Sequence, residues 1–570
     1  MRKHPLDHLK SYDAKAIARY YGRRPWLGIW RTLVITWSFL SLVIGVKLDA
    51  LFSRPPAASL LRAAQLRRIL THLGPTFIKV GQALSTRPDL VRRDYLDELI
   101  KLQDQLPPYP TSQARAIVEA ELGQPISLLY SDFAMAPVAA ASLGQVYKAI
   151  MHSGEVVAVK VQRPNLLPKV TLDLYLLRWA AGLIVPWLPL NLGFNLQLIV
   201  DEFGAKLFEE VDYLHEGQNA EKFAANFKGD PEVKVPKIYW SHCSTHVLTL
   251  EWIDGFKLTD TDRVQQADLD TNTLIKIGVT SGLRQLLEHG FFHADPHPGN
   301  LFALADGRMA YIDFGMMDQL DQATKETLVD AVVYLINKDY TDLADAFVRL
   351  GFLSPDTDIR PIIPALEAVF DSAIGESVRD FNFKTITDQF SELMYQYPFR
   401  VPAKFALIIR SLVTQEGLAL SLNADFRIVE VAYPYVARRL LSEESPAFRR
   451  RLLQILFKDN KFQWHRLENL ISIARTSDSF DLLPTARIGA SYLLSEEGAF
   501  LRRQVLVALV EDDRLHTEEV QRLWNLVKDD LQPNRLIGAA VQAIAHYSTA
   551  QAAAILPGVS ELAVLTQNPE

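Results

Sequence analysis

The stretch Phe292–Gly315, F-H-A-D-P-H-P-G-N-L-F-A-L-A-D-G-R-M-A-Y-I-D-F-G, decides how the rest of the chain is interpreted. Asp295 is followed five positions later by Asn300, and Asp313 comes thirteen positions after Asn300. Phosphoryl transfer needs one carboxylate near the attacking group and hard oxygen ligands for Mg²⁺ on the far side of the phosphates. Two short loops joined by a hairpin can supply all three groups.

Protein kinases use this spacing for their catalytic-loop Asp, their metal-binding Asn and their second metal-binding Asp. Each residue alone is equally well explained as a turn residue or a helix cap. The three together, with glycines beside them, favour a phosphoryl-transfer site. We therefore interpret Asp295 as the catalytic residue and Asn300 and Asp313 as metal ligands. His293 and His297, which flank Asp295, are interpreted as loop scaffolding.

The composition indicates a large globular protein. Its 570 residues suggest about three or four domains, and 49% apolar with 22% charged residues fit a chain with a large core. The net charge of -7 gives no support to a nucleic-acid partner. The single cysteine, Cys243, allows no intrachain disulfide and favours a reducing compartment. No Cys/His pattern indicates zinc.

The N-terminus predicts contact with a membrane. Residues 26–52 are largely apolar and contain three tryptophans, but the uncharged run Thr32–Val46 is shorter than the roughly 20 residues of a spanning helix. A basic stretch before a Trp-rich helix suits the interface of an anionic membrane. The alternative is a helix buried on the main domain. The basic residues are Arg2, Lys3, Lys10, Lys15, Arg19, Arg23 and Arg24.

Two other uncharged runs, 179–200 and 536–560, are interpreted differently. The first carries prolines and asparagines, and we expect buried helices and a turn there. The second is Ala-rich and contains polar residues. This composition gives weak support for insertion into lipid and indicates a packed helix or a peripheral membrane segment.

The order of predicted elements indicates an α+β protein of two lobes. Strand patterns occur at Val146–Ile150, Val156–Gln162, Val235–Trp240 and His246–Trp252. From Leu274 onward the pattern is mostly helical. A small sheet followed by helices is what a two-lobed kinase-like fold would show.

A nucleotide kinase must cover the phosphates with backbone amides, usually in a glycine-rich loop. The corresponding frame here reads A-A-A-S-L-G-Q-V, which keeps one glycine of three. Alanine disfavours positive φ, so we expect this loop to be stiffer over the phosphates. Such a loop alone is a weak signal. The predicted nucleotide-binding positions are Ala139, Ala140, Ala141, Ser142, Gly144 and Val146.

Lys160 ends the strand-like V-A-V-K and matches the lysine that contacts the α- and β-phosphates in kinases. The alternative is a solvated lysine at the end of a strand. Its carboxylate partner must come from residues 209–216, where Asp212 and Glu216 would share a helix face and Glu210 would lie elsewhere. This segment can therefore present carboxylates to different neighbours.

The segment after the fourth predicted strand fits the connection between two lobes. Glu251-Trp252-Ile253 is followed by the turn-forming Asp254-Gly255. In a kinase this segment is the hinge, whose backbone forms hydrogen bonds with adenine. We therefore add Glu251 and Ile253 to the predicted nucleotide site.

With these residues in hand, the chain resembles the UbiB family of atypical kinases, which has bacterial, mitochondrial coenzyme Q-linked and plastid members. The resemblance runs from about Leu60 to about Asp425. It depends on K-x-G-Q at Lys79–Gln82, the Ala-rich loop, E-x-D at Glu210–Asp212, and F-H-A-D-P-H-P-G-N ending at Asn300.

The resemblance implies an added helical extension that carries Lys79 and Gln82. In the family this extension packs over the site where a protein substrate would dock, and its lysine meets the E-x-D carboxylates. Carried onto this chain, Lys79 would face Glu210 and Asp212. These four residues would regulate the site.

The resemblance also implies a role for each catalytic residue. Lys160 would pair with Glu216, Asn300 and Asp313 would hold Mg²⁺, and Asp295 would be the catalytic Asp. The family binds adenine nucleotides, ATP or ADP, with magnesium. It is linked to isoprenoid quinones and related prenyl lipids at membranes, and looks more like ATPases or small-molecule kinases than protein kinases.

The expected organisation has five segments. They are a basic and apolar leader at 1–58, the helical extension at 59–133, the N-lobe at 134–255, the C-lobe at 256–438 and a helical C-terminal region at 439–570. The leader and the tail lie outside the resemblance.

The sequence thus predicts an ATP- and Mg²⁺-dependent atypical kinase or ATPase that acts in prenyl-lipid or quinone biosynthesis or homeostasis. Its expected partners are an adenine nucleotide, a prenyl lipid or quinone precursor, a membrane surface and quinone-biosynthesis enzymes. The expected location is the cytoplasmic face of a plasma membrane, or a thylakoid or plastid membrane in a photosynthetic source. Alternatives are a small-molecule phosphotransferase, and a nucleotide-binding scaffold without turnover.

Overall fold

The computed structural model describes residues 5–6, 9, 11–52, 57–85, 91–99, 101–102, 107–184, 196–296, 298–374, 397, 399–423, 426–428, 431–432, 434–436, 456–458, 461–475, 521–522 and 525. The chain divides into two compact units. The first comprises Met1–Glu326, Phe347–Ala365 and Asn382–Phe426, and the second Thr327–Ala346, Leu366–Phe381 and Arg427–Glu570. Every predicted site residue belongs to the first unit. The five sequence segments stay predictions.

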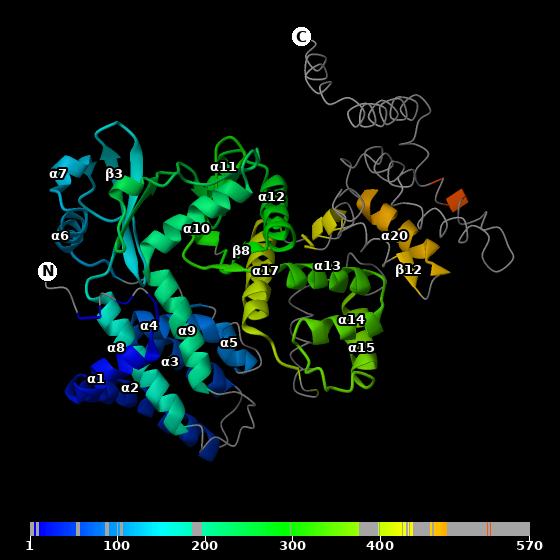
Figure 1. Ribbon diagram of the computed structural model, residues 1–570, viewed down its shortest axis with the longest axis horizontal. Coiled ribbons are helices and arrows are strands. Elements are labelled where there is room, and N and C mark those ends of the chain that lie inside the picture. Colours follow the sequence, from blue (N-terminus) through cyan, green and yellow to red (C-terminus); the bar gives the residue numbers. More distant parts are fainter. Residues whose placement is uncertain are drawn as a thin grey trace, which may run out of the picture. The chain divides into compact units, whose positions relative to one another are not determined.

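The first unit begins with a group of packed helices (Figure 1). Helix α3 contacts α2, α4 and α5, and its apolar residues Leu70 and Leu73 bury against Phe77 of α4. Helices α1, α2 and α4 also contact α8 (Leu166–Ile184), so α8 supports the whole group. The bounds are α1 Ala14–Gly22, α2 Pro25–Leu51, α3 Ala57–Leu73, α4 Pro75–Leu84 and α5 Arg93–Leu99.

An antiparallel sheet of five strands follows, in the order β1-β3-β4-β6 with β2 paired to β3. Strand β4 lies between β3 and β6, and its register places Lys160 opposite Val146 and Leu248. The bounds are β1 Tyr130–Phe133, β2 Ala139–Ala140, β3 Gly144–Met151, β4 Val156–Gln162 and β6 Val247–Glu251.

The period of two along β4 decides where Lys160 points. Val157, Val159 and Val161 bury against α6 (Thr111–Leu122) and α7 (Ile126–Leu129) on one face of the sheet. Successive side chains of a strand point to opposite faces. Lys160 therefore projects from the other face, where Ala158 packs with residues of α10.

Helices α8, α9 (Leu196–Val211) and α10 (Tyr213–Asn226) connect β4 to the rest of the unit. Phe223 of α10 is fully buried and contacts Tyr311 and Phe314, so α10 joins the sheet to the second half of the unit. Figure 1 shows α10 following α9 with a change of direction between the two helices.

The second half of the unit is mostly helical with short strands around the predicted loops. Strands β5-β10-β9-β7 form one small sheet, and β11 pairs with β8. Helix α12 continues into a π-helical segment, Gln285–His289, and packs against α17. The bounds are β5 Val233–Lys234, β7 Phe256–Lys257, β8 Phe291–His293, β9 Leu301–Ala303, β10 Met309–Tyr311, β11 Met317–Gln319, α11 Thr261–Gln266, α12 Thr271–Arg284 and α17 Ala403–Leu422.

Further short turns, helices and strands occur among the described residues. They are the 3-10 turns Trp240–His242 and Pro298–Asn300, α13 Gln322–Ile336, α14 Tyr340–Arg349, α15 Ile362–Ile374, β12 Phe457–Lys458, β13 Lys461–Phe462 and α20 Trp464–Arg475.

Two local predictions from the sequence are wrong. The strand expected at Val235–Trp240 is reduced to a single bridge at Ile238, since Pro236 cannot donate to a strand ladder and Trp240 starts a 3-10 turn. The run 179–200 is not uniformly buried, because Trp179, Leu183 and Leu198 are exposed. Most of its centre, the run 536–560 and His297 lie outside the described residues.

Candidate active site

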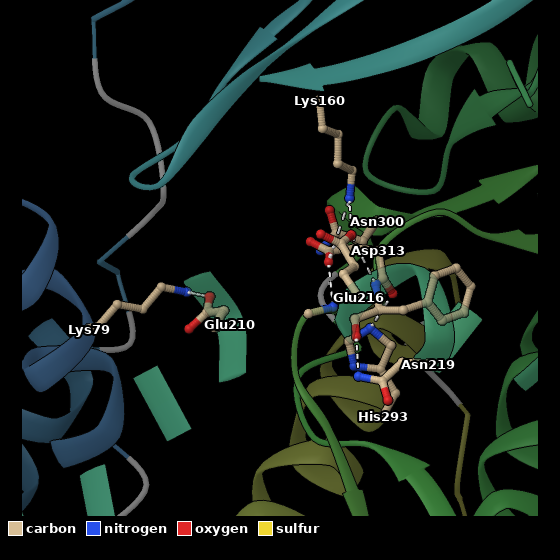
Figure 2. A network of polar contacts seen from close by, with 10 residues as sticks. Lys79, Lys160, Glu210, Glu216, Asn219, His293, Asn300 and Asp313 are labelled. Atoms are coloured by element: carbon tan, nitrogen blue, oxygen red, sulfur yellow. Dashed lines mark hydrogen bonds and ion pairs between the residues drawn. The ribbon is translucent and has the colours of Figure 1, made fainter. Parts of the chain in front are cut away.

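Lys160 and Glu216 meet between the small sheet and α10 (Figure 2). The Lys160 ammonium group forms an ion pair with the Glu216 carboxylate, and Lys160 Nζ lies 3.8 Å from Asp313 Oδ1. The Glu216 side chain is 5% exposed, whereas that of Asp313 is 39% exposed. The contact predicted between Lys160 and Glu216 is present, and Asp313 is the more accessible of the two carboxylates.

One ammonium group thus faces two carboxylates. The pKa of Glu216 is raised and that of Asp313 is lowered. Burial opposes the charge on Lys160, but Asp313 and Glu216 outweigh it and raise the pKa of the amine. Burial raises the pKa of Glu216 from 4.5 to about 7, against the opposing effect of Lys160. Burial also acts on Asp313, but Lys160 and the N–H of Gly315 hold its pKa well below the usual value. Lys160 and Asp313 are therefore charged, and Glu216 takes up a proton first.

Asn300 and Asp313 lie together at the accessible side of this cluster. The Asn300 side-chain amide donates to Asp313 Oδ2 at 3.2 Å, and Ile312 donates its backbone N–H to the Asn300 carbonyl at 3.2 Å. Mg²⁺ prefers oxygen ligands and is usually held by one or two carboxylates together with substrate phosphates and water. An accessible carboxylate beside a side-chain amide fits that ion. Across the described parts of the chain, no group of three or more His, Cys, Asp or Glu side chains is placed to hold a metal.

His293 joins the loop of Asp295 to the loop of Asp313. Its ring is buried, and its Nδ1 accepts from the backbone N–H of Asp295 at 3.1 Å. The Nε2 atom therefore carries the proton and donates to the Asp313 carbonyl at 3.0 Å. Burial lowers the pKa of His293, which keeps this neutral tautomer. The scaffolding role predicted for His293 is thus explained by its contacts.

Asp295 has a partner that the sequence reasoning missed. Arg410, on α17, donates from its guanidinium group to Asp295 Oδ2. The loop from Asp295 to Asn300 contains no lysine or arginine, so this cation comes from a helix 115 residues further along the chain. The available signal was a single arginine within the apolar run F-A-L-I-I-R-S-L-V, because charged residues inside an apolar helix usually have a buried partner.

The segment 209–216 provides carboxylates to two lysines, because the helix breaks inside it. Glu210 lies in the last turn of α9 and forms an ion pair with Lys79 of α4, apart from the Lys160 cluster (Figure 2). Asp212 has an extended backbone and caps α10 by accepting from the N–H of Leu214 at 3.0 Å. The expectation that Asp212 and Glu216 share a face of one continuous helix is therefore wrong. Glu210 and Glu216 belong to different helices and meet different cations.

Gln82 lies on the same helix as Lys79 and is buried. Its side-chain amide donates to the carbonyl of Leu102 at 3.1 Å, so it ties α4 to the chain that leads toward the sheet. Lys79 is only 7% exposed, which makes its pair with Glu210 a largely buried one. Both residues of K-x-G-Q thus fix the position of α4.

The Ala-rich loop starts as part of the sheet. Ala139 and Ala140 form β2 and pair with Val146 and Gln145 of β3. Ser142 is fully buried at the tip of the loop. At Gly144 an added Cβ would come within 2.3 Å of Tyr213 Oη and 2.7 Å of the Val161 carbonyl oxygen, so close approach explains the one glycine that the loop retains.

The outer side of the loop is held by Arg163 and Tyr109. The Arg163 side chain donates to the carbonyls of Ala141 and Pro107, at 3.0 Å each. Tyr109 exchanges two hydrogen bonds with the Gln145 side chain, one from its N–H at 3.2 Å and one to its carbonyl at 3.1 Å. The loop is thereby attached to the segment that precedes the sheet.

The predicted hinge residues lie at the end of β6. The N–H of Glu251 donates to the Lys237 carbonyl at 2.8 Å, and its carboxylate accepts from Lys234 Nζ at 2.8 Å. Ile253 follows in irregular backbone. Adenine binding at Glu251 and Ile253 stays a prediction.

A lysine on a small sheet, its carboxylate on the next helix and polar residues on two linked loops define a two-lobed, kinase-like protein. Residues 101–347 match the ABC1 atypical kinase-like domain, and residues 366–427 match the UbiB helical domain. The chain belongs to the UbiB, or ABC1, family of atypical kinases.

Three relatives illustrate the membership. An uncharacterized protein of Synechocystis is 65% identical, over 97% of this chain and 98% of its own length. Protein ACTIVITY OF BC1 COMPLEX KINASE 1, chloroplastic, of Arabidopsis thaliana is 47% identical, over 90% of this chain and 76% of its own length. Its relative ACTIVITY OF BC1 COMPLEX KINASE 3, chloroplastic, is 42% identical, over 87% and 70%.

Proposed function

We propose that this protein binds Mg-ATP at the Lys160, Glu216 and Asp313 cluster and transfers the terminal phosphate to a hydroxyl group or to water. The observation that supports this most is the convergence of Lys160, Glu216, Asn300 and Asp313 from four separate elements. Membership of an atypical kinase family is consistent with phosphoryl transfer.

Each residue has a definite task in this proposal. Magnesium bound with the nucleotide, held by Asn300 and Asp313, would supply positive charge at the phosphate oxygens. Lys160 binds the phosphates, and Glu216 holds the Lys160 side chain in place. Asp295 orients the acceptor and can take its proton at Oδ1, since Arg410 contacts Oδ2.

We further propose that the reaction occurs at a membrane and serves prenyl-lipid or quinone metabolism. The resemblance to UbiB proteins supports the substrate class. The two relatives from Arabidopsis carry the word chloroplastic in their names, which supports a thylakoid or plastid membrane. Helix α2 meets the length and composition of a membrane segment and is hardly buried, which supports attachment.

The test is Asp313→Asn with Asp306→Asn as the matched control. Asp306 pairs with Arg308 on the exposed turn between β9 and β10, away from the cluster. We expect Asp313→Asn to abolish magnesium-dependent nucleotide turnover and to leave the fold intact. Asp306→Asn should retain turnover.

Turnover would be measured as phosphate release, with and without lipid vesicles and quinone-like phenols. Wild-type turnover in Asp313→Asn would remove the assigned metal site. Tight nucleotide binding by the wild type without turnover in any condition would instead identify a nucleotide-binding scaffold.

A further inference from the structure

Helix α2 presents an apolar face that the described part of the chain does not cover. Trp26, Trp30 and Trp37 are 63%, 73% and 77% exposed. Spacings of three and four residues place side chains on one face of a helix. Together with the three tryptophans, that face carries Leu33, Leu40, Ile44, Leu48 and Leu51, all exposed.

The opposite face of α2 is attached to the protein at several points. Arg31 forms an ion pair with Asp173 of α8 at 2.7 Å and donates to the Leu73 carbonyl at 2.7 Å. Near the end of α2, Asp49 accepts from Arg62 of α3 at 2.6 Å. Between these points Val34, Ile35 and Phe39 pack into the core of the helical group.

This attachment decides how α2 can meet a bilayer. A helix that spans a bilayer is surrounded by hydrocarbon, so it would lose the ion pair of Arg31 with Asp173 and the packing of Val34, Ile35 and Phe39. By length and composition α2 could cross a bilayer, so these contacts with the protein decide against a crossing. A helix held along one side and apolar on the other lies parallel to a lipid surface.

The charges around α2 fit an anionic lipid surface. Lys15, Arg19 and Arg23 are exposed just before the helix, and Lys47 is exposed near its end. The acidic residues nearby are engaged, since Asp13 caps α1 and Asp49 pairs with Arg62. Tryptophan side chains favour the headgroup level of a bilayer.

Helices next to α2 add further exposed apolar side chains. Leu176 of α8 lies against Gly28 of α2, and α8 continues with the exposed Trp179 and Leu183. Figure 1 shows α8 and α9 extending toward the region of α2. Leu198, near the start of α9, is exposed as well.

We propose that α2 is a monotopic lipid-binding helix that lies in the plane of an anionic membrane surface, with its tryptophan face among the lipid headgroups and upper acyl chains. A second copy of the chain fits the face less well, because Leu27, Ile29 and Val43 make it wider than the narrow apolar stripe of a coiled coil. The proposal rests on the membrane location in the proposed function and identifies the surface that would make the contact.

The test uses the full-length protein without nucleotide, so that its outcome is independent of turnover. Flotation with phosphatidylcholine vesicles is compared with flotation after addition of phosphatidylglycerol. We expect binding to the anionic vesicles, and Trp30→Gln with Trp37→Gln should weaken it by about tenfold or more. The matched control is Leu128→Gln with Met135→Gln, two residues 65% and 82% exposed on the sheet half of the unit, which should bind like the wild type.

A second measurement needs no substitution. Tryptophan fluorescence of the wild type is quenched by lipids brominated at different depths, and we expect the strongest quenching from shallow bromines. Quenching by bromines at the bilayer centre would overturn the monotopic orientation. Two results would overturn the proposal that this face binds lipid. One is unchanged flotation of the tryptophan variant, and the other is a dimer in vesicle-free buffer that this variant abolishes.

Discussion

Replacing Arg410 by methionine removes the cation that holds Asp295 and keeps much of the apolar stem of the side chain. In the structure, the two side chains are 14% and 19% exposed, so the pair is largely but not fully buried. If Arg410 positions Asp295, the variant should bind nucleotide normally and turn it over slowly. This separates positioning of the acceptor from binding of the phosphates, the role proposed for Lys160.

The size of the effect follows from the burial of the pair. Breaking a buried ion pair costs about 3–5 kcal/mol, whereas an exposed pair contributes about 0–1 kcal/mol. With both side chains mostly buried, we expect Arg410→Met to lower the free energy of unfolding by about 2 kcal/mol. Misplacing a catalytic group by about 1 Å can cost about 100-fold in rate, so kcat should fall by about 10- to 100-fold.

The assay is a double-mutant cycle with Asp295→Asn. Turnover, nucleotide affinity and urea unfolding are measured for both single variants and for the double variant. Residues that act as a unit give non-additive effects, so Arg410→Met should change turnover little once Asp295 is already Asn. Arg308→Met, which removes an exposed partner of Asp306, is the matched control and should leave kcat unchanged.

Two results would refute this reasoning. If the two substitutions reduce kcat additively, Arg410 does not act through Asp295. If Arg410→Met raises kcat, the arginine restrains the catalytic carboxylate instead of positioning it. Arg410→Lys, which keeps the charge and loses the planar fork, should fall between wild type and Arg410→Met.

Three further predictions concern other parts of the site. Gly144→Ala places a Cβ 2.3 Å from Tyr213 Oη, so we expect the free energy of unfolding to fall by about 1–3 kcal/mol. Nucleotide binding, measured by calorimetry, should weaken as well. Adding Tyr213→Phe should restore part of both losses. Burial raises the pKa of Glu216 from 4.5 to about 7, so its contribution to stability is complete below pH 4.5 and is lost as the pH rises toward 7 and above. Glu216→Gln should remove that fall from unfolding curves recorded across this range, and an identical pH dependence in both proteins would contradict the assignment. Lys79→Met leaves Glu210 partly buried without this cation and should cost about 3 kcal/mol by urea unfolding, of which Lys79→Met with Glu210→Leu should recover part.

Residues that act through short sequence spacings could be predicted without coordinates. The neighbourhood of Asn300 and Asp313 follows from a hairpin that its own pattern indicates, whereas the residue patterns left the partner of Lys160 open within 209–216 and the resemblance to the UbiB family supplied Glu216. The apolar alternation along β4 likewise determines the face from which Lys160 projects.

Other features depend on contacts that no local pattern contains. Arg410 reaches Asp295 across 115 residues, and an arginine in an apolar helix does not indicate which carboxylate it meets. The break at Asp212 arises because its carboxylate caps α10, an option that competes with helix continuation for any aspartate. The scaffolding of Ala141 by Arg163 is also invisible in the sequence, since a backbone carbonyl accepts the hydrogen bond.

The attachment of Tyr109 and Arg163 to the Ala-rich loop has a practical consequence for dissecting this protein. Pro107 and Tyr109 form the chain just before the sheet, yet their hydrogen bonds with Arg163 and Gln145 make them structural supports of the Ala-rich loop. Cutting the protein at this junction to isolate the sheet and the later helices would remove supports of the Ala-rich loop together with the helices upstream. An altered activity in such a fragment would then report a displaced loop as readily as the loss of α4, and point substitutions in α4 distinguish the two.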